Sequence, residues 1–185
     1  MKMKRKLPAI LLASGLLLLG ACKKETTEEN AEELITTLKL ILTEDLSGTS
    51  TTFQFKDPDG DAGNPPTVFD EIVLKANTEY RCVVEVWNES VTPAVRLNEE
   101  IAAEAQDHQF YYIPSGVNLT VSSLDTDAKA LPVGLTSMWA TGTASTGKIQ
   151  IILKHKPGIK AAGDPVTKGD TDIELPSGGF TVKVQ

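Results

Sequence analysis

Cysteine, histidine and aromatic residues are all scarce in this chain of 185 residues. There are two cysteines and two histidines, and aromatic residues make up 5% of the chain. Cys22 is the expected site of a different covalent modification, so Cys82 lacks a partner for an internal disulfide. The stability of the fold must therefore depend on its hydrophobic core. Cys82 lies in an alternating apolar pattern, which predicts a buried side chain rather than a reactive thiol. The low aromatic content argues against a sugar hydrolase.

Basic residues are also few after position 21. The first 21 residues carry four of the 18 lysines and arginines and no acidic residue. The remaining 164 residues therefore have 14 basic and 25 acidic side chains, a net charge of −11 (14 − 25). Such a surface repels phosphate groups, so we expect no nucleic-acid partner. It is compatible with cation binding, although a solvated acidic surface has the same composition.

The first segment of the chain has a basic start and an apolar run. Four basic residues between positions 2 and 6 precede the run 7–20, which leads into Leu19-Gly20-Ala21-Cys22. This order is typical of a secretory signal peptide. The alternative is an uncleaved membrane anchor, but that needs about 20 apolar residues. The residues before Cys22 resemble the lipobox of bacterial lipoproteins, which implies that residues 1–21 are removed and that Cys22 carries a lipid.

Residues 22–33, CKKETTEENAEE, are polar and have no apolar period. We expect them to form a flexible tether between the membrane and one domain, residues 34–185. The Lys-Lys-Glu after Cys22 loosely resembles the export signals of Gram-negative surface lipoproteins. The expected location is therefore the outer membrane, on its periplasmic or cell-surface face, with the N-terminal lipid as the contact to the membrane.

Alternating apolar residues dominate the rest of the chain. They predict strands at 34–43, 51–56, 68–74, 80–87, 108–113, 117–122, 135–140, 148–155 and 180–184. Residues 97–106, LNEEIAAEAQ, are rich in Ala and Glu and predict one short helix. These elements predict an all-β domain, an antiparallel immunoglobulin-like β-sandwich of about nine strands with one short helix. A closed barrel is the second possibility.

The loop DPDGDAGN, residues 57–64, is the first candidate metal site. The carboxylates of Asp57, Asp59 and Asp61 suit a hard cation such as Ca²⁺, which takes six to eight oxygen ligands. The loop departs from the EF-hand pattern, because Ala62 stands at the glycine position and Val68 at that of the bidentate glutamate. The alternative is a polar hairpin loop with residues that favour turn dihedrals.

The second candidate metal site consists of Glu100, Glu104 and His108, spaced four residues apart. If the helix continues through Asp107, all three side chains lie on one face. Two carboxylates and an imidazole can then bind Zn²⁺ or another transition metal. The alternative is a solvated acidic face followed by a histidine at a helix-to-strand junction. The other histidine, His155, would strengthen the metal hypothesis if it lay beside His108.

Several short motifs together resemble a known group of proteins. They are the lipobox, ELITT at 33–37, the Asp-rich loop 57–64, LKANT at 74–78, DHQF at 107–110 and GDTDI at 169–173. The chain resembles short Gram-negative outer-membrane lipoproteins of poorly known function, similar to accessory lipoproteins found beside TonB-dependent receptors. Some of these are labelled as a type 1 periplasmic-binding fold, an α/β label that the strand pattern does not support. The resemblance implies an outer-membrane receptor as a partner and brings no catalytic residues.

Two functions from different classes are therefore expected. The first is a lipid-anchored binding or adaptor protein, not an enzyme, that assists nutrient or metal uptake at the outer membrane. It is motivated by the anchor, the tether and the absence of a complete catalytic motif. The alternative is a metal-dependent hydrolase that uses Glu100, Glu104 and His108. A bound Ca²⁺ or Zn²⁺ would be the cofactor at one of the two candidate sites.

Overall fold

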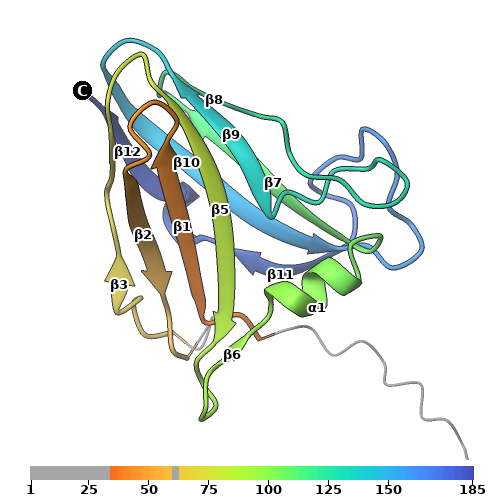
Figure 1. Cartoon of the computed structure of the whole chain (residues 1–185). Helices are drawn as coiled ribbons and strands as arrows, with labels where there is room; N and C mark the ends of the chain where they lie inside the picture. Colours follow the sequence, from red (N-terminus) through yellow and green to blue (C-terminus); the bar gives the residue numbers. More distant parts are fainter. Residues whose placement is uncertain (1–33, 60–62) are drawn as a thin grey trace, which may run out of the picture. The chain divides into compact units, whose positions relative to one another are not determined.

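The structure is a computed structural model that describes residues 34–59 and 63–185. The predicted signal peptide, Cys22, the predicted tether and Asp61 lie outside the described residues. No helix in the described part is long and apolar enough to cross a membrane. The described chain forms two sheets with one α-helix and one short 3-10 helix (Figure 1). The elements are β1 (Thr37–Glu44), β2 (Ser50–Lys56), β3 (Val68–Phe69), β4 (Ile72–Leu74), β5 (Glu79–Asn88), β6 (Val95–Arg96), α1 (Asn98–Ala103), β7 (His108–Ser115), β8 (Leu119–Ser122), β9 (Thr136–Thr141), β10 (Ser145–His155), β11 (Asp170–Glu174), η2 (Pro176–Gly178) and β12 (Phe180–Val184).

The first sheet has seven strands in the order β3-β2-β1-β5-β9-β8, with β6 paired to β5. All of its pairings are antiparallel. Leu38, Leu40 and Leu42 of β1 are buried, as the period of two predicted. Cys82 of β5 is also buried, which confirms that prediction, and burial raises the pKa of its thiol to about 12.

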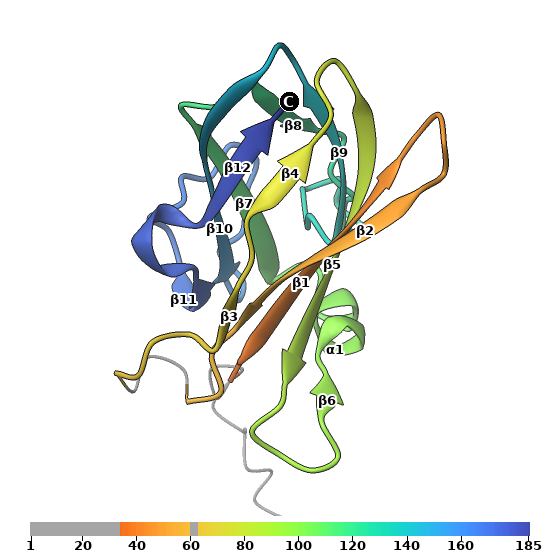
Figure 2. The same ribbon diagram turned by 90° about the vertical axis from the view of Figure 1, so that its left-hand side faces the viewer.

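The second sheet is built around the long strand β10. Strand β7 pairs along one edge of β10, while β11 and β12 follow each other along the opposite edge. Strand β4 lies beyond β12 and runs parallel to it (Figure 2). This parallel pair departs from the antiparallel arrangement that the sequence predicts, and every other pairing in the sheet is antiparallel.

The predicted single strand 68–74 is divided between the two sheets. Its first part, β3, pairs with β2, and its second part, β4, pairs with β12. Asp70 occupies the crossing, where its carboxylate accepts a hydrogen bond from the Gln54 backbone N–H at 2.8 Å. The backbone N–H of Asp70 in turn donates to the Gln54 carbonyl at 3.0 Å. These contacts hold the chain as it leaves the first sheet for the second.

One hydrophobic core lies between the sheets. Its largest fully buried apolar side chains are Trp139 of the first sheet and Phe110 and Phe180 of the second. Burial of a side chain of this size contributes about 1.5–3 kcal/mol. The prediction of an all-β fold is confirmed, and the described residues form a sandwich-like arrangement of two sheets with twelve strands rather than about nine. The immunoglobulin-like topology stays a prediction.

Helix α1 is shorter than the predicted 97–106. Its buried residue Ile101 packs into the core, and Asn98 fixes it to β5. The Asn98 side chain accepts from the Val86 N–H at 2.9 Å and donates to the Val84 carbonyl at 2.7 Å. At Glu104 the backbone leaves helical geometry, with φ −100 and ψ 29, and a turn leads into β7. The condition that the helix continues through Asp107 is therefore not met.

Candidate metal centre

His108 and His155 face each other at the end of the core. They are directly opposite in the pairing of β7 with β10. Their rings are stacked, with centroids 4.6 Å apart and planes at 7°. Both residues are buried, and they continue the inner face on which Phe110 and Leu153 are also opposite each other. Because side chains alternate across a strand, this register places both imidazoles on the core side of the sheet.

Glu104 adds a carboxylate to the histidine pair from the turn after α1. One ligand atom each of Glu104, His108 and His155 lie within 4.8 Å of one another. Among the described residues, this is the one group of three metal-ligating side chains. Its members come from a turn and two strands rather than from one helical face. The structure thus brings together Glu104 and His108, two of the three residues of the predicted site, adds His155, and leaves Glu100 exposed on α1 outside the group.

The backbone of Glu104 determines which nitrogen of His108 carries the proton. The Glu104 carbonyl oxygen lies 3.2 Å from Nδ1 of His108. A carbonyl only accepts, so Nδ1 is assigned as the donor and Nε2 holds the lone pair. A hydrogen bond from one ring nitrogen to a carbonyl is typical of histidines that bind a metal through the other nitrogen.

Asp172 approaches His108 from the third strand of this sheet. Its Oδ2 lies 3.7 Å from Nε2 of His108, and its side chain is 1% exposed. Leu153 pairs with Ile173 and Lys154 pairs with Thr171, so Asp172 is the extra residue of a β-bulge in β11. Bulges re-aim side chains and occur often beside functional sites. The bulge explains how a carboxylate in an edge strand reaches the inner face of the sheet.

Burial favours the neutral form of His108. Desolvation lowers the pKa of His108 below the ordinary 6.5 and outweighs the opposing hydrogen bond to the Glu104 carbonyl. The neighbouring His155 lowers the pKa further. Neutral imidazole is the form that binds metal ions, so the site holds His108 in its ligating state.

Two buried lysines attach the loop after β10 to the neighbouring elements. The Nζ of Lys156 donates to the Tyr111 hydroxyl and lies 4.7 Å from the centroid of its ring. The Nζ of Lys160 lies 3.0 Å from a carboxylate oxygen of Asp127 and donates to the Ala105 carbonyl at 2.7 Å. These contacts link the end of β10, which carries His155, to the turn that carries Glu104.

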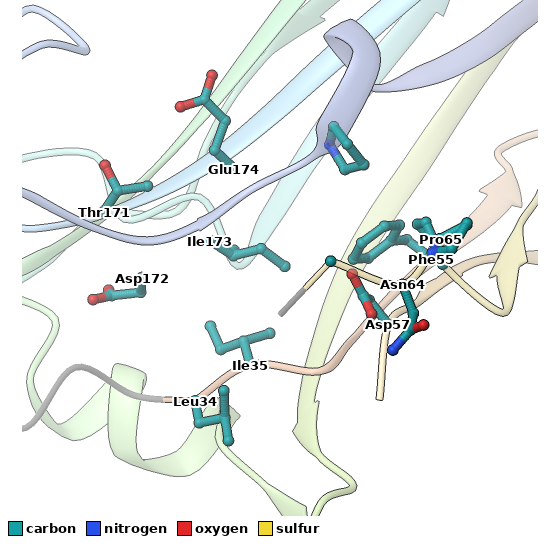
Figure 3. A pocket seen from close by; sticks show the side chains of 13 residues that line it. Leu34, Ile35, Phe55, Asp57, Asn64, Pro65, Thr171, Asp172, Ile173 and Glu174 are labelled. Atoms are coloured by element: carbon teal, nitrogen blue, oxygen red, sulfur yellow. The ribbon is translucent and has the colours of Figure 1, made fainter. Parts of the chain in front are cut away.

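A pocket of about 570 Å³ lies next to the metal-ligating group, and Asp172, which contacts His108, is part of its lining. Asp172 and Asp57 lie at opposite ends of its lining, with Ile35 and Ile173 between them (Figure 3). The Asp172 carboxylate is turned away from Asp57 (Figure 3). Asp172 thus lines the pocket while its carboxylate lies against His108.

The predicted calcium loop is described in part. Asp57 is buried and lines the pocket, Asp59 is exposed, and Asp61 lies outside the described residues. The Asp59 carboxylate accepts a hydrogen bond from the Asn64 side chain, which lowers the pKa of Asp59. Among the described residues, Asp57 and Asp59 belong to no group of three ligands. The calcium hypothesis therefore stays a prediction.

Comparison with known proteins identifies no family. No protein-family model matches the chain, and no curated protein or solved structure matches it. Function is therefore inferred from the geometry of Glu104, His108, His155 and Asp172.

Proposed function

We propose that this protein is a lipid-anchored lipoprotein of the bacterial envelope that binds a divalent transition-metal ion through Glu104, His108 and His155. The observation that carries the proposal is the approach of their ligand atoms to within 4.8 Å of one another. Two imidazoles and a carboxylate are donors that Zn²⁺ and related ions prefer. Lipidation at Cys22 would hold this site at the outer membrane, as the lipobox implies.

The surroundings favour binding of an ion without a large rearrangement. The pairing of β7 with β10 fixes both histidines, and the Glu104 carbonyl orients the ring of His108. Glu104 is exposed, so an ion can reach the group from solvent on that side. We infer that the protein acts as a binding or adaptor module in metal uptake, beside an outer-membrane receptor. The resemblance to lipoproteins that accompany TonB-dependent receptors supports this role.

A metal-dependent hydrolase is the second candidate function. Glu104 and His108, two of its three expected ligands, belong to the group, and Glu100 does not. Two histidines and one carboxylate also occur in catalytic zinc sites, where water occupies the fourth position. The burial of both histidines restricts access of a substrate to the ion and favours the binding function.

Calorimetric titration of Zn²⁺ into the full chain in detergent tests the proposal. We expect saturable binding of about one ion per chain and a loss of affinity of more than about 100-fold in His155→Ala, because loss of even an outer-shell partner costs about 10–100-fold. Glu100→Gln is the control, since it removes an exposed carboxylate of α1 that does not belong to the group, and its affinity should equal that of wild type. Equal binding by wild type and His155→Ala, or no saturable binding by wild type, would contradict the proposal.

A further inference from the structure

We propose that Asp172 is a fourth protein donor to the metal ion, so that two histidines and two carboxylates enclose it. The inference rests on the proposed function and deepens it, because the number of protein donors separates a binding site from a catalytic one. It starts from the contact between Nε2 of His108 and Oδ2 of Asp172. Asp172 is not a member of the group of Glu104, His108 and His155, but its carboxylate contacts His108, which is a member.

The separation of these two atoms is close to that of two ligands on one ion. Zinc bonds to nitrogen and oxygen are about 2.1 Å long, and a tetrahedral angle then places two ligand atoms about 3.4 Å apart. The observed distance is 3.7 Å. A hydrogen bond between nitrogen and oxygen would be shorter, at about 2.7–3.2 Å. A shift of roughly 0.3 Å brings the pair to the separation of metal ligands.

The protonation of His108 supports the same conclusion. Because Nδ1 donates to the Glu104 carbonyl, Nε2 presents a lone pair toward the Asp172 carboxylate. A cation between this lone pair and the carboxylate would attract both donors. Asp172 occupies a β-bulge. Its carboxylate is turned away from Asp57 (Figure 3), and its Oδ2 lies 3.7 Å from this nitrogen.

A fourth protein donor has a functional consequence. Structural zinc sites have four protein ligands, whereas catalytic sites keep one position open for water or substrate. With Asp172 bound, the two carboxylates neutralise the charge of a divalent ion and no position remains for a reacting water. The inference therefore assigns the site to binding of the ion rather than to hydrolysis. It also makes the ion a link between β7, β10, β11 and the turn after α1.

Visible absorption of bound Co²⁺ tests this inference, because four-coordinate Co²⁺ absorbs far more strongly than six-coordinate Co²⁺. The full chain in detergent is titrated with Co²⁺ alone as wild type, Asp172→Asn and Asp170→Asn. Asp170 lies in the same strand, is exposed and carries the same charge, so its variant is the matched control. We expect intense bands for wild type and Asp170→Asn, and weaker, shifted bands for Asp172→Asn with an affinity lowered by more than about tenfold.

The outcomes distinguish this inference from the proposed function. If Asp172→Asn gives the spectrum and affinity of wild type, Asp172 is not a donor, and the site of Glu104, His108 and His155 stands alone. If wild type binds no Co²⁺ and no Zn²⁺, the proposed function and the inference are both overturned. Circular dichroism of the metal-free variants verifies folding, and Asp172→Ser, which also removes the carboxylate, repeats the test where Asp172→Asn fails to fold.

Discussion

His108 and His155 lie directly opposite each other on β7 and β10, and their rings stack with planes 7° apart. This contact places two imidazoles side by side at the end of the hydrophobic core, next to the carboxylate of Glu104. The two strands that carry them pair with each other over the whole length of β7. Binding of an ion by both histidines would therefore stabilise the folded chain as well as fill a site.

The first prediction concerns thermal unfolding of the full chain in detergent. An ion that binds only the folded state stabilises it by about 2.7 kcal/mol when its free concentration is 100 times the dissociation constant. Zn²⁺ should therefore raise the unfolding temperature of wild type by several degrees and leave that of His155→Ala unchanged. Mg²⁺ is the control ion, because it prefers oxygen ligands and should produce no shift. Equal shifts in the two proteins would argue against the site.

Much of the fold follows from local patterns in the sequence. Strands β1, β5 and β10 are predictable because a strand with one buried face shows a period of two. Strand β11, DTDIE, shows no such alternation, and the two residues of β6 are too few to show any. The division of 68–74 between two sheets depends on pairing partners elsewhere in the chain, which a local pattern does not specify.

The candidate site is predictable only in part. The spacing of Glu104 and His108 places them close together, although through a turn rather than through a helix. The approach of His155 depends on the register between β7 and β10. Asp172 enters through a bulge, where one extra residue changes the direction of a side chain. Registers and bulges are set by pairing between distant segments, so the sequence alone did not assign these two residues to the site.

The second prediction concerns Tyr111, whose hydroxyl accepts a hydrogen bond from the buried Lys156. Tyr111→Phe removes a partner of a buried charged group, and we expect a loss of about 1.5–3 kcal/mol in the free energy of unfolding. Tyr80→Phe is the matched control, because it removes a hydrogen bond with the neutral backbone N–H of Lys75 and should cost about 0.5–1.5 kcal/mol. Urea unfolding measures both. A loss at Tyr111 no larger than that at Tyr80 would refute the importance of this contact.

The third prediction concerns the dependence of stability on pH at Asp164. Its carboxylate accepts hydrogen bonds from the Lys168 side chain at 2.8 Å and the Ala161 N–H at 2.7 Å. The Lys168 contact, supported by the Ala161 N–H and the charges of Lys168 and Lys156, lowers the pKa of Asp164 below its ordinary 3.8. A lowered pKa in the folded state stabilises the protein above the unfolded value, and this contribution is lost as pH falls through the folded pKa.

Comparison of wild type with Asp164→Asn isolates this contribution. The difference between their free energies of unfolding should be constant from about pH 7 to about pH 5 and should shrink below the unfolded value of 3.8. Urea unfolding at a series of pH values gives the difference directly. A difference that stays constant down to about pH 2 would show that Asp164 has no lowered pKa.

The fourth prediction concerns the lipid anchor. Cys22→Ser removes the thiol that the lipobox presents, so we expect no incorporation of labelled fatty acid and a chain that keeps residues 1–21. Cys82→Ala is the matched control, because Cys82 is buried in the core, and its lipid labelling should equal that of wild type. Labelling of Cys22→Ser at the level of wild type would refute the anchor.

The metal content of the full chain tests the central claim most directly. The chain is recovered from membranes in detergent without added metal or chelator, and its metals are measured by elemental analysis. We predict about one transition-metal ion per wild-type chain and close to none in His108→Ala and His155→Ala, because each variant removes one of the ligands that converge at the site. A folded wild-type chain that contains no such ion, and takes up none from a buffer with Zn²⁺, would contradict the account.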